Sequence, residues 1–495
     1  MKKYILIIAV FFSIGISGCK KDYLSLEQNP NQPSVSPPGI TLAGALAVAA
    51  NTINTAYAQD GVWVQYFSRS GSYVPNTSLD EFQITNTSFT GVWTTLYQNL
   101  TNFNNLQVSA AKDASQANYQ AIAMIMKVYD FQQLVDNFGD VPYSQAFQPS
   151  TILFPAYDKQ KDIYADLGKQ LDAAIGLINK SGGATDPGTA DIVFGGDMTG
   201  WKKFANSLKL RLAIRVSTVS PSDPLITALA STSSEGYLDG DTQALANPGY
   251  ANTLSGSASQ QSPFYAAYGF DVTGNATFFN NYYRGNTYFI NKLTDFNDPR
   301  LAKVYDVNNN GVIDGNPFGI ATNAKSNAAT SPPGPGLLKS PTMDAVLFSG
   351  AESLFLQAEA LQKGFSIGGS LSAQQAYEAG VTASFVAMGL TAAQATTYYG
   401  QAIPNVGFAS SNKLEAIAYQ KWISLIGYNN LEGYLEYLRT GYPILPSPVS
   451  QDPNAVSATL PIRQYYPLSE VTSNPTQVGK EPTIDIFKTK LFWEQ

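Results

Sequence analysis

Segments with apolar residues at helical spacing follow one another along most of this chain, and they constrain its fold more than any other feature. Small residues, chiefly Ala and Gly, recur on these segments and allow close helix contacts. No strict 34-residue repeat is visible. We therefore expect a mainly α fold of tetratricopeptide-like helix pairs. The segments are residues 40–59, 91–111, 115–138, 158–181, 201–219, 351–365, 372–390 and 411–443.

Residues 231–345 have a different composition. They are rich in Gly, Asn, Ser, Thr, Pro and aromatic residues and show little helical period. A long irregular run inside a compact domain is usually functional. We expect loops and a few short strands that lie over the helical scaffold and form a loop-rich ligand face.

The N-terminus has the features of a lipoprotein signal peptide at residues 1–18. Lys2 and Lys3 precede an apolar run at residues 4–16, which as a helix reaches about 20 Å, less than the ~30 Å core of a bilayer. The small residues before Cys19 resemble a bacterial lipobox, so this single cysteine is the expected lipidation site. An ordinary signal peptide with a chance cysteine is the alternative.

Polar residues and prolines fill positions 19–38, which we interpret as a flexible tether between the lipid anchor and the globular domain. Residues 39–495 are then one α-helical binding domain, with 231–345 as an insertion in it. Lipid anchoring would hold this domain at a membrane surface.

Composition excludes several functions. The chain has no histidine, which rules out serine–histidine triads and histidine-ligated zinc. Its formal net charge of -7 and pI near 4.8 are unfavourable for nucleic acid. Aromatic residues make up 12% of the chain, with 29 Tyr, and suit contacts with polar ligands that have apolar faces.

Two aromatic segments are the candidates for such contacts, because they interleave rings with amides and an arginine. They are residues 62–73 and 277–289. A sugar site needs a flat ring beside hydrogen-bonding groups. The predicted ligand-binding residues are Trp63, Tyr73, Asn281, Tyr283 and Arg284, with Trp93 as a weaker candidate because its helical segment suits a core position.

An EF-hand-like loop at residues 306–315 is a candidate calcium site. Its possible ligands stand at positions 1, 3, 5 and 9, with Gly311 at position 6. Position 12, normally Glu, is Pro317, which should weaken binding. An Asn/Gly turn is the alternative. The possible ligands are Asp306, Asn308, Asn310 and Asp314.

Paired carboxylates offer one route to catalysis. Glu352 and Glu359 would lie about 10.5 Å apart along one helix, a poor match to the separations of about 5–9.5 Å in glycosidases. We expect them instead to form partly buried ion pairs with Arg211 and Arg215.

Several stretches together resemble the SusD/RagB family of Bacteroidetes outer-membrane lipoproteins, in its SusD-like variant. They include QQLVDNFGDVPYSQAF, WKKFANSLKLRLAIR, LFLQAEALQKGF, EAIAYQKWISLIGYNNLEGYLEYLRTGYP and TKLFWEQ, in order across essentially the whole chain. The resemblance implies a SusD-like fold and a non-catalytic, cofactor-free role in binding a nutrient, usually an oligosaccharide, at the cell exterior. It also implies a SusC-type TonB-dependent transporter as partner.

The resemblance favours a scaffold role for DNFGDVPY, residues 136–143, as a tight interhelical turn with Gly139 as a C-cap. Asp158 is placed to cap the helix that follows. A carboxylate-dependent glycoside hydrolase and a binder of a non-sugar nutrient such as a peptide remain the alternative functions.

Overall fold

The computed structural model describes residues 36–148 and 150–494 as a mainly helical body. The predicted signal peptide, the lipidation site Cys19 and nearly all of the predicted tether lie outside these residues. Within them, the first helix, α2 (Pro38–Thr55), begins where the composition changes. The expected mainly α fold with few short strands is confirmed.

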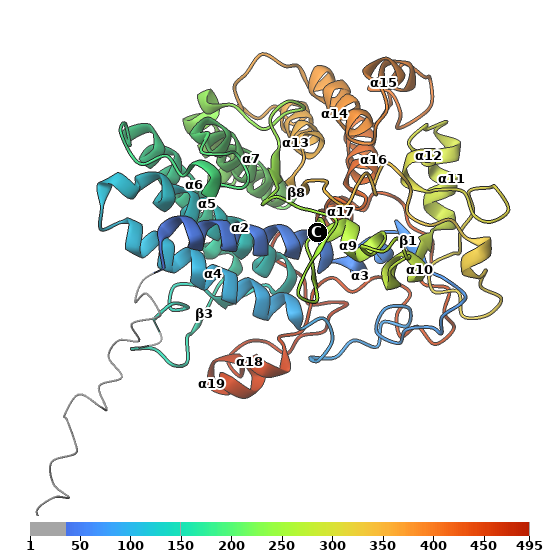
Figure 1. Cartoon of the computed structure of the whole chain (residues 1–495), viewed down its shortest axis with the longest axis horizontal. Coiled ribbons are helices and arrows are strands. Elements are labelled where there is room, and N and C mark those ends of the chain that lie inside the picture. The colour runs from blue at the N-terminus through green and yellow to red at the C-terminus, as the bar shows by residue number, and fades with distance from the viewer. Residues whose placement is uncertain (1–35, 149, 495) are drawn as a thin grey trace, which may run out of the picture.

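The N-terminal half of the scaffold is a series of long helices in which neighbours in sequence also pack together (Figure 1). Most of their Leu, Ile and Phe side chains are buried, and this removal of apolar surface from water is the main stabilising contribution. The members after α2 are α4 (Gly91–Ala110), α5 (Ala117–Phe138), α6 (Gln160–Lys180) and α7 (Met198–Ser217).

A second group of helices contacts the first group where its member α13 packs against α7. The predicted segment 411–443 is two helices, because Gly427 adopts a left-handed conformation with φ of 72° and ends the first of them. The group consists of α13 (Gly350–Gln362), α14 (Ala373–Ala387), α15 (Ala392–Tyr399), α16 (Lys413–Leu425) and α17 (Asn430–Thr440).

The connection between α5 and α6 spans residues 139–159, so it is longer than the tight interhelical turn that we expected, and its two ends pair as the short strands β2 (Val141–Pro142) and β3 (Tyr157–Asp158). Gly139 forms the C-cap of α5 at a φ of 77°. The N-terminus of α6 differs from expectation: Asp140, not Asp158, accepts a hydrogen bond from the backbone N–H of Gln160 at 2.8 Å. Asp158 lies one residue too early and accepts from the backbone N–H of Tyr143.

Together, helix α2 and the short α3 (Ala58–Trp63) are long and apolar enough to cross a membrane, as judged by length and composition only. One face of α2 instead packs against α4, α5 and the strand β8 (Ala345–Phe348). Leu42, Leu46 and Ile53 are buried there, so the apolar composition serves the core.

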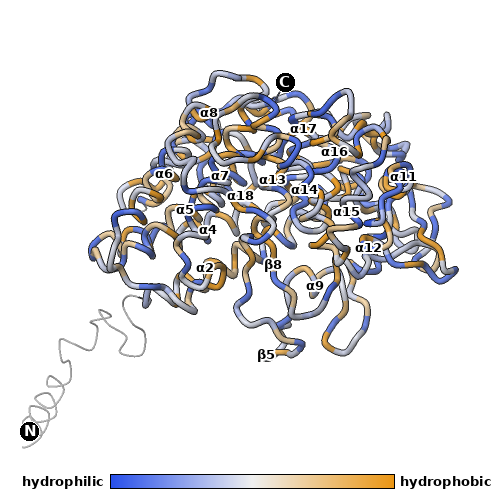
Figure 2. The backbone as a smooth tube through the Cα atoms, turned by 90° about the horizontal axis from the view of Figure 1, so that it is seen from above, coloured by the Kyte–Doolittle hydropathy of each residue, from blue (hydrophilic) through white to orange (hydrophobic). Residues whose placement is uncertain are grey.

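The loop-rich region 231–345 forms short elements over this scaffold. Its strands belong to two-stranded sheets, in which β4 (Ala244–Ala246) pairs with β8 and β5 (Leu254–Ser255) pairs with β6 (Ala258–Ser259). The β5–β6 hairpin projects from the body beside α9 (Figure 2). The region also holds helices too short to give a helical period: α9 (Pro263–Tyr268), α10 (Phe278–Tyr282), α11 (Thr287–Asp295) and α12 (Leu301–Val304).

Candidate functional site

The two aromatic segments singled out in the sequence meet in one antiparallel sheet. Strand β1 (Phe67–Arg69) pairs with β7 (Tyr283–Gly285), so that Arg69 stands opposite Tyr283. The backbone N–H of Ser70 continues the pairing by donating to the carbonyl of Tyr282 at 2.8 Å. The loop-rich region therefore folds back onto the segment that follows the first helices.

Three rings gather where this sheet meets α10, and we call them the aromatic surface: Tyr73, Phe278 and Tyr282. The Phe278 and Tyr282 rings stack with centroids 5.4 Å apart, and Tyr73 lies 5.6 Å from Phe278 and 5.2 Å from Tyr282. Phe278 is 60% exposed, whereas Tyr282 is nearly buried beneath the other two. An exposed ring supported from below is a platform on which a ligand can stack.

Hydrogen-bonding groups border the aromatic surface. Asn281 is half-buried, and its Oδ1 accepts from Asn327 Nδ2 at 3.3 Å. The Asn327 backbone N–H donates to Ser72 Oγ at 3.1 Å, which links this rim to the loop that carries Tyr73. The Asn281 NH2 donates to the carbonyls of Ala276 and Thr277, so what the rim offers a polar ligand is the exposed Ser72 hydroxyl and the second lone pair of Asn281 Oδ1.

Arg284 and Tyr283 support this surface from below. The Arg284 guanidinium donates to the carbonyls of Asn280, Asn327 and Thr330, and burial lowers its pKa to about 10. Tyr283 is 7% exposed and packs against other rings. The prediction that these two side chains contact a ligand needs correction, because both are turned into the fold.

The tryptophans of the N-terminal segments are core residues. Trp63 is fully buried, and its indole N–H donates to the Leu79 carbonyl at 3.2 Å. It lies against Phe89 and Tyr434, so it has no surface to offer a ligand. Trp93 is buried beside Phe138, as its helical segment suggested.

Phe278 and Tyr282 were within a predicted segment but were not among the predicted contacts. A signal for them exists in the sequence: Thr277 caps α10, and residues four apart on a helix share a face. Nothing in the sequence marks Asn327, which reaches the rim only through the tertiary fold.

The loop 306–315 is a turn closed by protein groups. Asn308 Oδ1 accepts from the backbone N–H of Asn310 at 2.8 Å, and Gly311 has a φ of 78°. Asp314 forms an ion pair with Lys325 at 2.6 Å, so a lysine side chain already contacts one of the predicted calcium ligands. Asp306 Oδ1 accepts from the next backbone N–H, that of Val307. These contacts favour the Asn/Gly turn, and calcium binding stays a prediction.

Glu352 and Glu359 lie in buried ion pairs, as expected for structural carboxylates, but only one of the predicted partners is right. Arg211 pairs with Glu352 at 2.7 Å. Glu359 pairs with Arg439 at 2.6 Å, and the Arg439 and Lys363 cations hold the pKa of Glu359 below its usual value.

Arg215 pairs instead with Glu432 from α17, at 2.5 Å. The sequence could not identify these partners because α17 reaches α7 and α13 only through the tertiary fold. Each carboxylate is neutralised by a buried cation, which suits scaffold ion pairs rather than an acid–base site.

A search of protein-family models matches residues 30–467 to the SusD-like family described as "Starch-binding associating with outer membrane". A comparison with curated proteins found no match. Among solved structures, the chain is similar to a chitin-binding protein at 27% identity and a TM-score of 0.76, over 93% of this chain and 100% of that one.

Two further structures show the same fold. A SusD homologue from Bacteroides uniformis has 24% identity and a TM-score of 0.73, with 92% of this chain and 99% of that one covered. A chitin-binding SusD homologue from Flavobacterium johnsoniae has 22% identity and a TM-score of 0.72, with 91% and 98% covered. The members of this family are binding proteins rather than enzymes. The chain therefore belongs to the SusD-like family of outer-membrane nutrient-binding proteins, among the SusD/RagB homologues of Bacteroidetes.

Proposed function

We propose that this protein binds an oligosaccharide at the aromatic surface and delivers it to a SusC-type TonB-dependent transporter in the outer membrane. The observation that carries the proposal is the pair of contacting rings, the exposed Phe278 and the half-buried Tyr73, bordered by the amide of Asn281 and the hydroxyl of Ser72. A sugar ring presents an apolar CH face to such rings and hydroxyls to such polar groups.

The likeness to a chitin-binding protein at 27% identity supports a glycan as ligand. Chitooligosaccharides are therefore the first probes to use. Membership of the family supports contact with a transporter, and a lipid anchor at Cys19 would keep the protein beside this partner.

A binding assay tests the ligand class. Calorimetry with a panel of oligosaccharides and a panel of peptides of similar length should give binding to at least one sugar, weakened by Phe278→Ala. Binding to peptides alone would favour the peptide-binding alternative and reject the proposal.

A second assay tests the partner. Purification from the native outer membrane in mild detergent, after cross-linking in cells, should yield a TonB-dependent transporter with this protein. Recovery of this protein without a transporter in cross-linked cells would contradict the delivery step while leaving the ligand proposal intact.

A further inference from the structure

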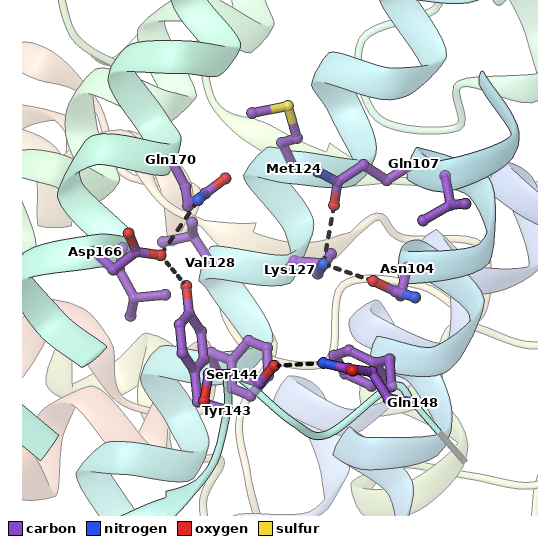
Figure 3. A pocket seen from close by; sticks show the side chains of 14 residues that line it. Asn104, Gln107, Met124, Lys127, Val128, Tyr143, Ser144, Gln148, Asp166 and Gln170 are labelled. Atoms are coloured by element: carbon purple, nitrogen blue, oxygen red, sulfur yellow. Dashed lines mark hydrogen bonds between the residues drawn. The ribbon is translucent and has the colours of Figure 1, made fainter. Parts of the chain in front are cut away.

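A separate pocket of about 460 Å³ opens between α4, α5, α6 and the loop at residues 143–148 (Figure 3). This volume lies within the range of about 300–1,000 Å³ typical of small-molecule sites. Figure 1 places α5 and α6 at one end of the long axis and α10 with β1 at the other. The pocket is therefore distinct from the aromatic surface.

One wall of the pocket presents hydrogen-bond donors around a half-buried cation. Lys127 Nζ donates to Asn104 Oδ1 and to Gln107 Oε1, both at 2.9 Å. An ammonium group only donates, so the two amide oxygens must face it and their NH2 groups remain available to a ligand. In the described ranges neither NH2 group donates to the protein, and Lys127 forms no ion pair.

Burial affects this cation. It lowers the pKa of Lys127 to about 8, because the charged form loses hydration that the two neutral amides replace only in part, and the Asp166 carboxylate across the pocket opposes this shift without cancelling it. An anion placed beside the third N–H would compensate the charge. Lys127 and its two amides therefore form a receptor for a carboxylate.

The opposite wall presents acceptors. Asp166 on α6 accepts from the Tyr143 hydroxyl at 2.5 Å and from Gln170 Nε2 at 3.2 Å. Both donors converge on one oxygen, Oδ2, which leaves Oδ1 free to accept from a ligand hydroxyl. Gln170 directs its NH2 toward Asp166, so its carbonyl oxygen faces away from that carboxylate and is a further acceptor (Figure 3).

Aromatic rings lie between the two walls. Phe131 contacts Tyr143 with centroids 4.7 Å apart and Phe147 at 6.0 Å. Lys127 Nζ lies 5.3 Å from the centre of the Phe147 ring. The pocket therefore combines an apolar surface with one basic end and one acceptor end.

We propose that this pocket binds an acidic saccharide unit, a sugar ring that carries a carboxylate such as a uronic acid. Its carboxylate would pair with Lys127, its hydroxyls would donate to Asp166 and Gln170, and its CH face would lie against Phe147. The choice of a sugar rests on the proposed function. A neutral sugar would leave Lys127 with no anion in contact and only the attraction of the more distant Asp166 carboxylate, and an acidic peptide side chain lacks the row of hydroxyl donors that the acceptor wall fits.

The net charge of the whole chain bears on where an acidic sugar can bind. With a formal net charge of -7, the protein repels acidic saccharides on average. Measurable binding of such a sugar therefore needs a local basic site, and Lys127 is positioned to provide it.

The test uses trigalacturonate and its methyl ester, which differ in charge but share the same rings. Calorimetry should show tighter binding of the acid than of the ester. Lys127→Met, which keeps the apolar stem, should weaken binding of the acid about ten- to a hundred-fold and leave the ester unchanged. Lys292→Met is the matched control, since Lys292 is also half-buried with its Nζ 5.6 Å from a ring centre, that of Tyr288.

Several results would overturn the inference. They are equal binding of acid and ester, no binding of the acid at millimolar concentration, and unchanged binding by a Lys127→Met protein whose circular dichroism matches the parent. Loss of acid binding in Phe278→Ala but not in Lys127→Met would move the acidic sugar to the aromatic surface. That outcome would reject this second site and leave the proposed function intact. Failure of neutral oligosaccharides to bind would count against the proposed function alone.

Discussion

The rings of Tyr73 and Phe278 lie with centroids 5.6 Å apart in a T-shaped contact, although they come from distant parts of the chain. The pairing of β1 with β7 brings them together. Tyr73 is half-buried and Phe278 is the more exposed of the two. Each ring can therefore contact a ligand while the neighbouring ring supports that ring from the side.

Replacing either ring by Ala should weaken oligosaccharide binding by about 1–2 kcal/mol, or roughly five- to thirty-fold. The double variant should lose less than the sum, because the rings contact each other. Calorimetry with the best sugar from the panel measures both effects. Phe154→Ala is the control, since Phe154 is also exposed but lies beside α19 (Pro475–Val478). An equal loss in the control would argue against this placement of the site.

Trp63→Ala should lower the free energy of unfolding by about 3–5 kcal/mol, because it empties a buried site. Denaturant unfolding measures this change. Trp63→Phe, which keeps most of the ring volume, should bind the sugar like the parent protein. A folded Trp63→Phe variant with strongly reduced affinity would restore Trp63 as a contact residue.

Asp130 should make the protein less stable as the pH rises from about 4 to 8. The side chain is fully buried on α5, where burial raises its pKa to about 8, and Asn99 donates to it at 2.9 Å. The folded state therefore keeps a proton that the unfolded chain releases above its ordinary pKa near 4. The stability contributed by this proton is complete below pH 4 and is lost as the pH approaches 8, by up to about 1.4 kcal/mol per pH unit.

Asp130→Asn removes that titration and keeps the acceptor for Asn99. We expect its melting temperature to exceed that of the parent at pH 8 and to match it near pH 4, as measured by thermal scans across this range. Asp241→Asn, at an exposed aspartate, is the control. A constant difference at all pH values would show that Asp130 does not titrate in this way.

Calcium binding at residues 306–315 would require Asp314 to exchange Lys325 for the ion. If the loop binds the ion, millimolar calcium should raise the melting temperature more in Lys325→Met than in the parent, and Asp306→Ala should remove the effect. Magnesium is the control ion. If the melting temperature of neither protein shifts with calcium or with EDTA, the loop is an Asn/Gly turn and not a calcium site.

Cys19→Ala should leave the protein without lipid, since no other residue in the chain can form the thioether. Metabolic labelling with a clickable fatty acid followed by gel fluorescence measures this. Equal labelling of the variant and the parent would contradict the predicted anchor.

Local patterns in the sequence were enough to predict most of the long helices and to single out the two aromatic segments that pair as β1 and β7. Apolar spacing predicted α4 to α7, and Gly139 ended α5 where expected. The short α10 was not predicted, because its five residues are fewer than two helical turns and give no helical period. Asp158 failed as a cap because a shift of one residue moves a side chain out of reach of the helix N-terminus.

The sequence by itself determined the helical scaffold, the family and the two aromatic segments, because these depend on composition and on spacing between near neighbours. Only the tertiary structure decided which aromatic rings are exposed. Trp63 and Phe278 stand in similar aromatic contexts, yet one is fully buried and the other is 60% exposed. The same holds for Lys127, whose two amide partners come from α4 while the lysine is on α5. Burial and charge compensation depend on which elements pack against a side chain, and residues distant in sequence supply those elements.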